Sequence, residues 1–190
     1  MINKLIHQIL GPIPNDLVLH CIKSWQILSQ HNFEFKIWND ESILEFLKEN
    51  YLFALPSFEN ARNTGEASDI ARYLIVYHWG GYYIDWDIQL NNIDNFILMH
   101  DQSPNGCLII DPSNGTLASE FFSATVQERF LLELVKDIVE TYNRGERDLM
   151  LTPQYSGPFR MKTSLARHPI EYFALKCTTI SRQSIPPLLV

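Results

Sequence analysis

Long hydrophobic runs, clusters of positive charge and paired cysteines are all missing from this sequence of 190 residues. Without a run of 18 apolar residues, no membrane-spanning helix is expected. The chain has 22 acidic and 15 basic residues, a formal net charge of −7, and no Lys/Arg cluster, so a nucleic-acid-binding role is not expected. Cys21, Cys107 and Cys177 are widely spaced and form no C-x-x-C pair, which predicts reduced thiols, two of them buried.

The amino terminus also lacks the pattern of a signal peptide. The segment MINKLIHQILG has one Lys, and His7 and Gln8 break its short apolar run. We therefore expect a cytoplasmic protein with peripheral membrane contact at most. The composition, 46% hydrophobic and 19% charged, is that of a globular protein, and the length predicts one domain over residues 1–190.

The first half of the chain predicts alternating strands and helices. A buried strand is expected from Asn3 to Leu10, and a period-2 strand from Phe33 to Trp38. Apolar residues at helical spacing predict a helix from Pro14 to Gln30, capped by Asn15 or Asp16, and another that begins at Asp40 or Ser42 and ends at Tyr51. This order is typical of a parallel α/β layer.

The second half predicts fewer regular elements. Strands are expected from Cys107 to Ile110 and from Leu117 to Ala124, and an amphipathic helix from Glu128 to Tyr142. A connecting segment is expected from Leu52 to Asn63, and the exit from the preceding strand followed by a turn is expected from Ile88 to Leu98.

The central stretch, Ser68 to Leu90, carries the candidate chemistry. Apolar spacing predicts a helix from about Glu66 to His78, with Thr64 or Ser68 as its cap. Gly80 and Gly81 break it, and Tyr82 to Ile84 favours a strand that ends in Asp85-Trp86-Asp87. Two carboxylates at i and i+2 can converge on one Mg²⁺ or Mn²⁺; the alternative is a solvated acidic turn.

A second pair of charges lies on the helix before this turn. Asp69 and Arg72 are three residues apart and share a helix face. Such a pair stabilises a helix by only roughly 0.2–0.5 kcal/mol. Once the glycines fold the strand back, this face should approach Asp85 and Asp87, where a carboxylate suits a sugar hydroxyl and a guanidinium suits a diphosphate.

These residues form the pattern S-D-x-x-R-Y-x-x-x-Y-x-x-G-G-x-Y-x-D-x-D between Ser68 and Asp87. The pattern resembles the sugar-nucleotide-binding region of DXD-type glycosyltransferases (glycosyltransferase family 32) and, more distantly, the glucosylating domains of large clostridial toxins. The resemblance implies a GT-A-type α/β fold, a Rossmann-like mixed sheet flanked by helices. It also implies a retaining transfer of a hexose from a UDP- or GDP-sugar to a glycan or lipid-linked acceptor, in surface polysaccharide or lipooligosaccharide synthesis.

The resemblance also implies roles for single residues. Asp69 and Arg72 would be catalytic, holding the donor sugar and phosphate. Asp87 would bind Mn²⁺ or Mg²⁺ directly, and Asp85 would bind the metal through water or would bind the ribose and sugar hydroxyls. The residues implied to contact the donor are Ile9, Leu10, Tyr83, Asp85 and Gly157.

Three further positions carry implied or open roles. The segment from Lys4 to Leu10 resembles the family's opening strand K-I-I-H-Q-I-W, but Leu10 replaces the aromatic residue and offers the base only apolar contact. Ser156-Gly157-Pro158 resembles the family's T-G-P loop, with an ordinary loop as the alternative. His168 is a candidate late metal ligand. His7 is either a ligand or a core histidine.

Two rival functions remain open. One is a nucleotide-sugar-binding relative without transfer activity, suggested by Leu10 and the short tail. The other is a haloacid-dehalogenase-like phosphatase, which also places D-x-D after a strand. Ile88 and Gln89 follow the motif here where that class usually has Gly or Thr, and no later acidic pair is present.

Overall fold

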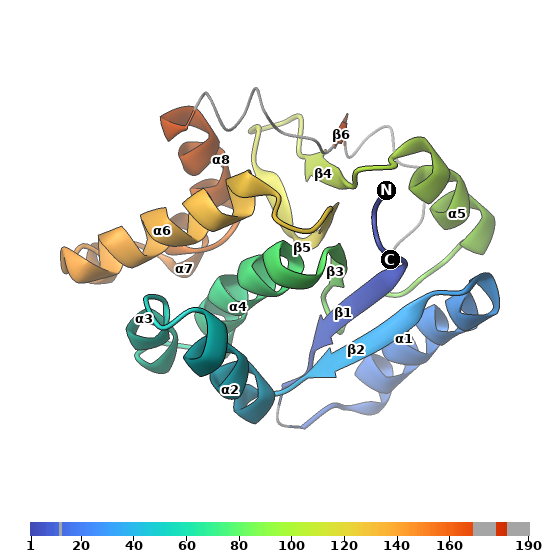
Figure 1. Cartoon of the computed structure of the whole chain (residues 1–190), viewed down its shortest axis with the longest axis horizontal. Helices are drawn as coiled ribbons and strands as arrows, with labels where there is room; N and C mark the ends of the chain where they lie inside the picture. Colours follow the sequence, from blue (N-terminus) through green and yellow to red (C-terminus); the bar gives the residue numbers. More distant parts are fainter. Residues whose placement is uncertain (12, 169–177, 182–190) are drawn as a thin grey trace.

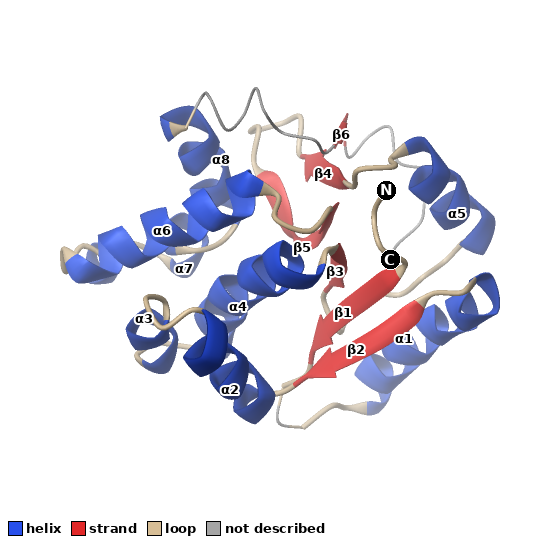
Figure 2. Cartoon of the chain, viewed as in Figure 1, coloured by secondary structure: helices blue, strands red, loops and turns tan. Residues whose placement is uncertain are grey.

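The computed structural model describes residues 1–11, 13–168 and 178–181. Its strands form one mixed six-stranded sheet in the order β2-β1-β3-β5-β4-β6 (Figures 1 and 2). β1 is parallel to β2 and β3, β5 is antiparallel to β3 and β4, and β4 is parallel to β6. The predicted mixed α/β sheet is therefore confirmed. The strands are β1 (Leu5–Ile9), β2 (Glu34–Trp38), β3 (Gly81–Ile84), β4 (Cys107–Ile110), β5 (Leu117–Ala124) and β6 (Thr178–Ser181).

Helices cover both faces of this sheet (Figure 1). Helices α1 and α5 lie on one face, and α2, α3, α4, α6 and α8 lie on the other. The helices are α1 (Asp16–Gln26), α2 (Asp40–Asn50), α3 (Leu55–Glu59), α4 (Thr64–Trp79), α5 (Ile93–Gln102), α6 (Arg129–Asn143), α7 (Thr152–Tyr155) and α8 (Pro158–Arg167), with 3₁₀ helices η1 (Ile27–His31) and η2 (Arg147–Leu149).

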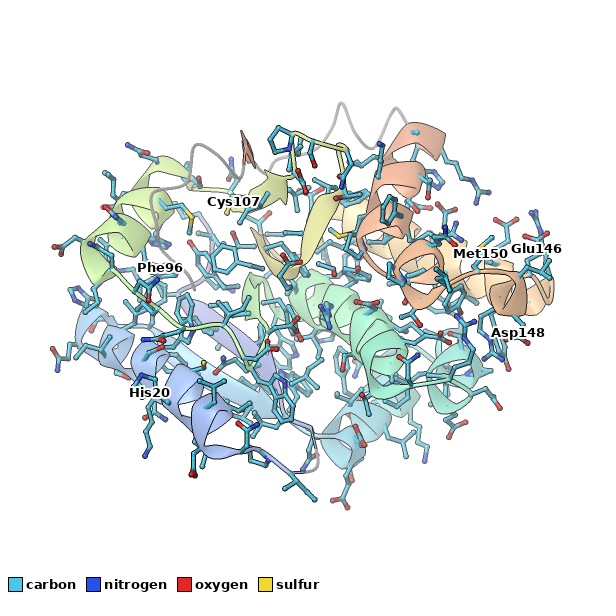
Figure 3. All side chains as sticks on the ribbon, turned by 180° about the vertical axis from the view of Figure 1, so that it is seen from behind. His20, Phe96, Cys107, Glu146, Asp148 and Met150 are labelled. Carbon is cyan, nitrogen blue, oxygen red and sulfur yellow. The ribbon has the colours of Figure 1, made fainter. Side chains whose placement is uncertain are left out.

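The core consists of two hydrophobic clusters, one on each face. Side chains alternate along a strand, so Tyr83 packs with α4 and α6 while its neighbour Tyr82 packs with α1 and α5. On the second side, Phe96 of α5 and Cys107 of β4 belong to the same cluster (Figure 3). The sheet thus separates two apolar layers, and α4 with β3 forms its centre.

Several predicted boundaries were wrong. The segment from Leu52 to Asn63 contains α3, and the segment from Ile88 to Leu98 contains the start of α5. Two helices that were not predicted, α7 and α8, flank Ser156 and Gly157. Each of these helices begins at a signal that resembles loop chemistry: the Asn92 side chain caps α5, and proline occupies the first turn of α3, α7 and α8.

Two predicted helix caps also moved by one residue or more. Asn39, rather than Asp40 or Ser42, caps α2, and its side chain accepts a hydrogen bond from the Ser42 N–H at 2.9 Å. Asn63, rather than Thr64 or Ser68, caps α4 and accepts a bond from the Glu66 N–H, also at 2.9 Å. Asparagine competes well for this position because its short carbonyl reaches the free backbone N–H groups.

Other predictions hold. Cys21 and Cys107 are free and buried, while Cys177 lies outside the described residues. His7 is a core histidine: its Nε2 lies 3.0 Å from the Gly80 carbonyl oxygen, and its Nδ1 accepts a bond from the Trp38 indole. No helix among residues 1–11, 13–168 and 178–181 has the length and apolar character needed to cross a bilayer.

Candidate functional site

The site is built on the turn that joins α4 to β3. Gly80 and Gly81 have φ of 66° and 93°, in the left-handed region that favours glycine. An added Cβ at Gly81 would collide with the Leu5 carbonyl oxygen of β1. The double glycine therefore lets the chain reverse tightly against β1, and β3 then runs back beside the helix that precedes it.

Arg72 of α4 is the centre of the site. Its side chain is buried, and its Nη1 donates to the Ser119 carbonyl oxygen of β5 at 2.8 Å while its Nε donates to the Ser68 carbonyl oxygen at 3.2 Å. The same guanidinium lies 3.5 Å from Asp69 Oδ1 and 3.3 Å from Asp85 Oδ1. Its planar fork therefore holds two carboxylates from two different elements.

Asp85 and Asp87 differ in exposure. β3 ends at Ile84, and the Ile88 N–H donates to the Asp85 carbonyl oxygen, so the two acidic residues lie on a turn. The Tyr83 hydroxyl donates to Asp85 Oδ1 at 2.6 Å, and the Tyr83 ring lies 4.5 Å from the Arg72 guanidinium carbon. Asp85 is therefore fixed from within the protein, whereas Asp87 is exposed.

Burial governs the protonation of these groups. It raises the pKa of Asp69 to about 6, against the opposing effects of Arg72 and the Ser156 hydroxyl. It also raises the pKa of Asp85, again opposed by Arg72 and by the Tyr83 hydroxyl. For Arg72, burial lowers the pKa, but Tyr83, Asp69 and Asp85 more than reverse this, so the guanidinium stays charged.

The loop between α7 and α8 closes one side of the site. The Ser156 hydroxyl donates to Asp69 Oδ2 at 2.8 Å, and the Tyr73 hydroxyl donates to the Ser156 carbonyl oxygen at 2.9 Å. An added Cβ at Gly157 would lie 3.3 Å from Asp69 Oδ2 and 3.1 Å from Pro153 Cα. The predicted Ser156-Gly157-Pro158 loop thus reaches the helix that carries Asp69.

An ion pair with one buried partner lies where the start of α4 meets the segment that leads into α7. Glu66 is fully buried and accepts from Arg62 Nε at 2.8 Å, and Arg62 Nη1 also donates to the Met150 carbonyl oxygen at 2.8 Å. The Asn63 amide donates to the Thr152 hydroxyl at 3.0 Å. These contacts hold the segment that leads into α7 against the start of α4, with Glu66 as the buried partner of the exposed Arg62.

The exit from the acidic turn is held by α1, on the opposite face of the sheet. The Trp25 indole N–H donates to the Ile88 carbonyl oxygen at 2.7 Å, and the Ser24 hydroxyl accepts from the Leu90 N–H at 2.9 Å. The Cys21 thiol donates to the Asp87 carbonyl oxygen at 3.4 Å. The turn is therefore held at both ends before any ligand binds.

A hollow of about 160 Å³ opens beside these groups. It is smaller than a cavity that takes a whole drug-sized ligand, so it can hold only part of a nucleotide sugar. Its lining joins the end of β1, the first turns of α4 and the acidic turn: Ile9, Gly11, Thr64, Gly65, Ser68, Arg72, Tyr83, Asp85, Trp86 and Asp87.

The donor set fits a divalent cation that is shared with a ligand. Asp85 and Asp87 both line the hollow and supply carboxylate oxygens, which Mg²⁺ and Mn²⁺ prefer. Within the described residues, no group of three or more His, Cys, Asp or Glu side chains is placed to hold a metal. Phosphate oxygens and water would therefore complete the coordination.

The structure brings most of the predicted site residues together. Asp69 and Arg72 meet Asp85, with Tyr83 beneath them, and Ile9 lines the hollow. Gly157 reaches the site from the far side through Asp69. Leu10 is not part of the lining; its N–H donates to the Trp38 carbonyl oxygen at 2.8 Å.

His168 is another predicted residue that does not line the hollow beside Asp85 and Asp87. It caps the end of α8, and its Nε2 lies 3.1 Å from Asp137 Oδ1 of α6. The prediction rested on its late position in the sequence, whereas the fold places it in a contact between two helices.

Sequence reasoning missed residues that act through tertiary contacts. Trp86 lines the hollow, and its ring lies so close to Gly11 that an added Cβ there would collide with it. Its place between the two aspartates was the available signal. Ser119 and the α1 residues Ser24 and Trp25 carry no local signal, since their partners lie 47 to 66 residues away.

Comparison with known proteins agrees with this geometry. Residues 15–104 match the family described as "Glycosyltransferase sugar-binding region containing DXD motif". Inositol phosphoceramide mannosyltransferase 1 of Schizosaccharomyces pombe is 29% identical over 117 residues, covering 60% of this chain and 35% of that protein. A mannosyl phosphorylinositol ceramide synthase of Saccharomyces cerevisiae is 38% identical over 89 residues, covering 46% and 23%. The chain thus spans about a third and about a quarter of these curated relatives.

Solved structures share the fold at low sequence identity. The PaToxG glycosyltransferase superposes with a TM-score of 0.65 at 16% identity, covering 91% of this chain and 74% of that one. The ligand-free glycosyltransferase domain from the YGT toxin gives 0.67 at 10% identity, covering 100% and 81%. Its UDP-bound form gives 0.53 at 11% identity, covering 90% and 56%. In sequence over residues 15–104, and in fold, the chain is therefore similar to glycosyltransferases whose sugar-binding region contains the DXD motif.

Proposed function

We propose that the chain is a metal-dependent glycosyltransferase that moves a hexose from a UDP- or GDP-sugar to a hydroxyl group of an acceptor. The observation that carries this proposal is the ion pair of Arg72 with Asp85 on the wall of the hollow beside the acidic turn. Asp69, the second carboxylate that Arg72 contacts, is buried and does not itself line the hollow. This arrangement offers a fixed cation for a diphosphate and fixed acceptors for sugar hydroxyls. The UDP-bound toxin domain of the same fold and the mannosyltransferase names of the relatives support a nucleotide-sugar donor.

Each side chain has a distinct part in holding the donor. Asp69, ionised above about pH 6, accepts hydrogen bonds from the sugar. Arg72 keeps Asp69 and Asp85 in place and faces the phosphate. Asp85 and Asp87 would hold Mn²⁺ or Mg²⁺, which when bound neutralises charge on the leaving diphosphate. Tyr83 fixes the Asp85 carboxylate through its 2.6 Å hydrogen bond.

The transfer exchanges one bond to the sugar C1 for another. The acceptor hydroxyl oxygen forms a bond to C1, and the bond between C1 and the diphosphate oxygen breaks. The diphosphate leaves with the bonding electrons, and its oxygen takes the proton of the attacking hydroxyl. The buried, preorganised charges of the site favour this step because they need no rearrangement as charge develops.

Thermal unfolding with a panel of UDP- and GDP-sugars, with and without Mn²⁺, tests the donor site. A ligand that binds the folded state raises the free energy of unfolding by about 2.7 kcal/mol at a hundredfold excess over Kd. We expect stabilisation by one donor only in the presence of the metal, and its loss in Asp87→Ala. Asp101→Ala, an exposed carboxylate of α5, is the matched control and should keep the effect.

Turnover separates transfer from binding alone. We expect slow hydrolysis of the same donor by wild type and none by Asp87→Ala. If no donor stabilises the protein with Mn²⁺ present, the proposed donor site is wrong. Stabilisation without hydrolysis or transfer would instead identify a nucleotide-sugar-binding protein.

A further inference from the structure

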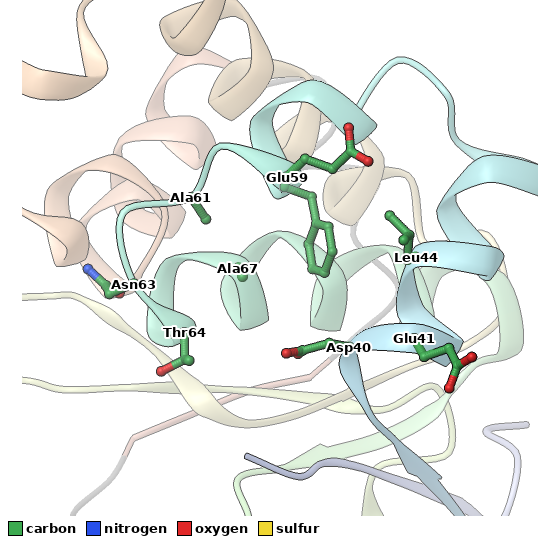
Figure 4. A pocket seen from close by; sticks show the side chains of 9 residues that line it. Asp40, Glu41, Leu44, Glu59, Ala61, Asn63, Thr64 and Ala67 are labelled. Carbon is green, nitrogen blue, oxygen red and sulfur yellow. The ribbon is translucent and has the colours of Figure 1, made fainter. Parts of the chain in front are cut away.

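A second and larger cavity lies on the other side of the first turn of α4. It has a volume of about 630 Å³ and is open to solvent. Its walls are the start of α2, the end of α3, the segment that follows α3 and the first turn of α4 (Figure 4). The volume is within the range of cavities that bind small molecules.

The rim of this cavity is acidic. Asp40 and Glu41 at the start of α2 and Glu59 at the end of α3 all line it, and in Figure 4 the Asp40 side chain extends toward Thr64. The described lining residues include no Lys, Arg or His. At neutral pH, carboxylates only accept hydrogen bonds, so the rim suits a ligand rich in hydroxyl donors and repels phosphate.

The floor of the cavity is apolar. Phe58 of α3, Leu44 of α2, Ala61 and Ala67 of α4 form this part of the lining. A floor of apolar side chains below a rim of hydrogen-bond acceptors matches the two sides of a pyranose ring, one with C–H groups and one with hydroxyl groups. A lipid tail would match the floor but not the rim.

The cavity adjoins the proposed donor site. Thr64 lines both this cavity and the hollow that contains Arg72, Asp85 and Asp87. Only the first turn of α4 separates them, and the Asn63 cap and the buried Glu66 fix that turn. Thr64 is therefore the point at which the cavity and the proposed donor site meet.

We infer that this cavity, bounded by Asp40, Glu41, Glu59 and Phe58, binds the acceptor and that the acceptor is a neutral saccharide rather than a phosphate-bearing molecule. This inference rests on the proposed function and adds the acceptor class and its location. It separates this chain from the acceptor in the name of its Schizosaccharomyces pombe relative, inositol phosphoceramide, which carries a phosphate. The distinction rests on charge, because the acidic residues of the cavity would repel a phosphate but not a neutral saccharide.

The test compares neutral and anionic acceptors in a transfer assay with labelled donor. The neutral probes are the methyl glycosides of mannose, glucose, galactose and N-acetylglucosamine, and the anionic probe is myo-inositol 1-phosphate. We expect transfer to at least one methyl glycoside and little transfer to the phosphate. Preferential transfer to the phosphate, or none to any methyl glycoside while the donor is still hydrolysed, would overturn the inference.

Variants of the cavity then locate the acceptor. Glu59→Lys should raise the KM for the methyl glycoside by about tenfold, the effect of losing one hydrogen bond to a charged group. Glu59→Lys should also increase the rate of transfer to myo-inositol 1-phosphate. Ala67→Leu, which adds a larger side chain to the apolar floor, should also raise the KM for the methyl glycoside. Glu49→Lys, an exposed charge reversal on α2 outside the cavity, is the matched control.

Donor hydrolysis keeps the two hypotheses distinguishable. If wild type neither binds nor hydrolyses any nucleotide sugar, the proposed function itself fails. If Glu59→Lys and Ala67→Leu hydrolyse the donor at the wild-type rate and also keep the wild-type KM for the methyl glycoside, the acceptor lies elsewhere and this inference alone fails.

Discussion

The buried carboxyl group of Asp69 should make the stability of this protein depend on pH in a defined direction. An aspartate in the unfolded chain titrates near 3.8, whereas burial raises the pKa of Asp69 in the folded protein to about 6. Folding therefore favours the protonated form. The contribution to stability is fully present below about pH 4 and is lost as the pH rises through about 6.

The expected size follows from that difference. About two pKa units correspond to about 3 kcal/mol in the free energy of unfolding over the whole titration. Between pH 4 and pH 7.5 the change is about 2 kcal/mol, because the unfolded aspartate is already partly ionised at pH 4. Asp69→Asn removes the titration but keeps the side-chain shape and an oxygen for the Ser156 hydroxyl. Relative to wild type, the variant should gain about 2 kcal/mol of stability when the pH is raised from 4 to 7.5.

Urea denaturation followed by tryptophan fluorescence measures this difference, since the chain has four tryptophans. Asp94→Asn, an exposed carboxylate in the first turn of α5, controls for the loss of a surface charge. If the stability difference between Asp69→Asn and wild type is the same at both pH values, the assignment of a raised pKa to Asp69 is wrong. Donor affinity should rise over the same pH range because the ionised carboxylate is the better hydrogen-bond acceptor.

Two further substitutions probe the contacts around Asp69. Arg72→Lys keeps the charge, but one ammonium group cannot contact the Ser119 and Ser68 carbonyl oxygens and two carboxylates at once. We expect the free energy of unfolding to fall by about 1–3 kcal/mol and the donor to stabilise the variant no longer in thermal unfolding. An unchanged free energy of unfolding and an unchanged response to the donor would contradict the central role of the Arg72 guanidinium. Gly157→Ala would place a methyl group 3.3 Å from Asp69 Oδ2. Calorimetry should show weaker donor binding, with only a small change in the free energy of unfolding. An unaltered donor affinity would place the donor away from this loop.

The sequence predicted the centre of the site because that part depends on local spacing. Asp69 and Arg72 share a helix face, the two glycines permit the reversal, and Tyr83 and Asp85 lie on the same side of a strand. Each of these relations spans a few residues. The ion pair between Arg72 and Asp85 then follows from the close packing of α4 on β3.

The parts that were not predicted depend on contacts between distant segments. Trp25 reaches the Ile88 carbonyl only because α1 crosses the sheet on the face opposite α4. The start of α5 was assigned to a turn because Asn92 is as typical of turns as of helix caps. His168 was assigned to the metal by sequence position alone, and its contact with Asp137 depends on how α8 packs on α6.

The acidic turn touches both hydrophobic clusters at once. Its entrance is tied to the α4 layer through Tyr83 and Arg72, and its exit is tied to the α1 layer through Trp25. A donor bound at this turn would therefore link the two hydrophobic clusters. Local unfolding of either cluster would release the donor. Donor binding should therefore increase the cooperativity of unfolding and slow hydrogen exchange in both α1 and α4, although these helices lie on opposite faces of the sheet.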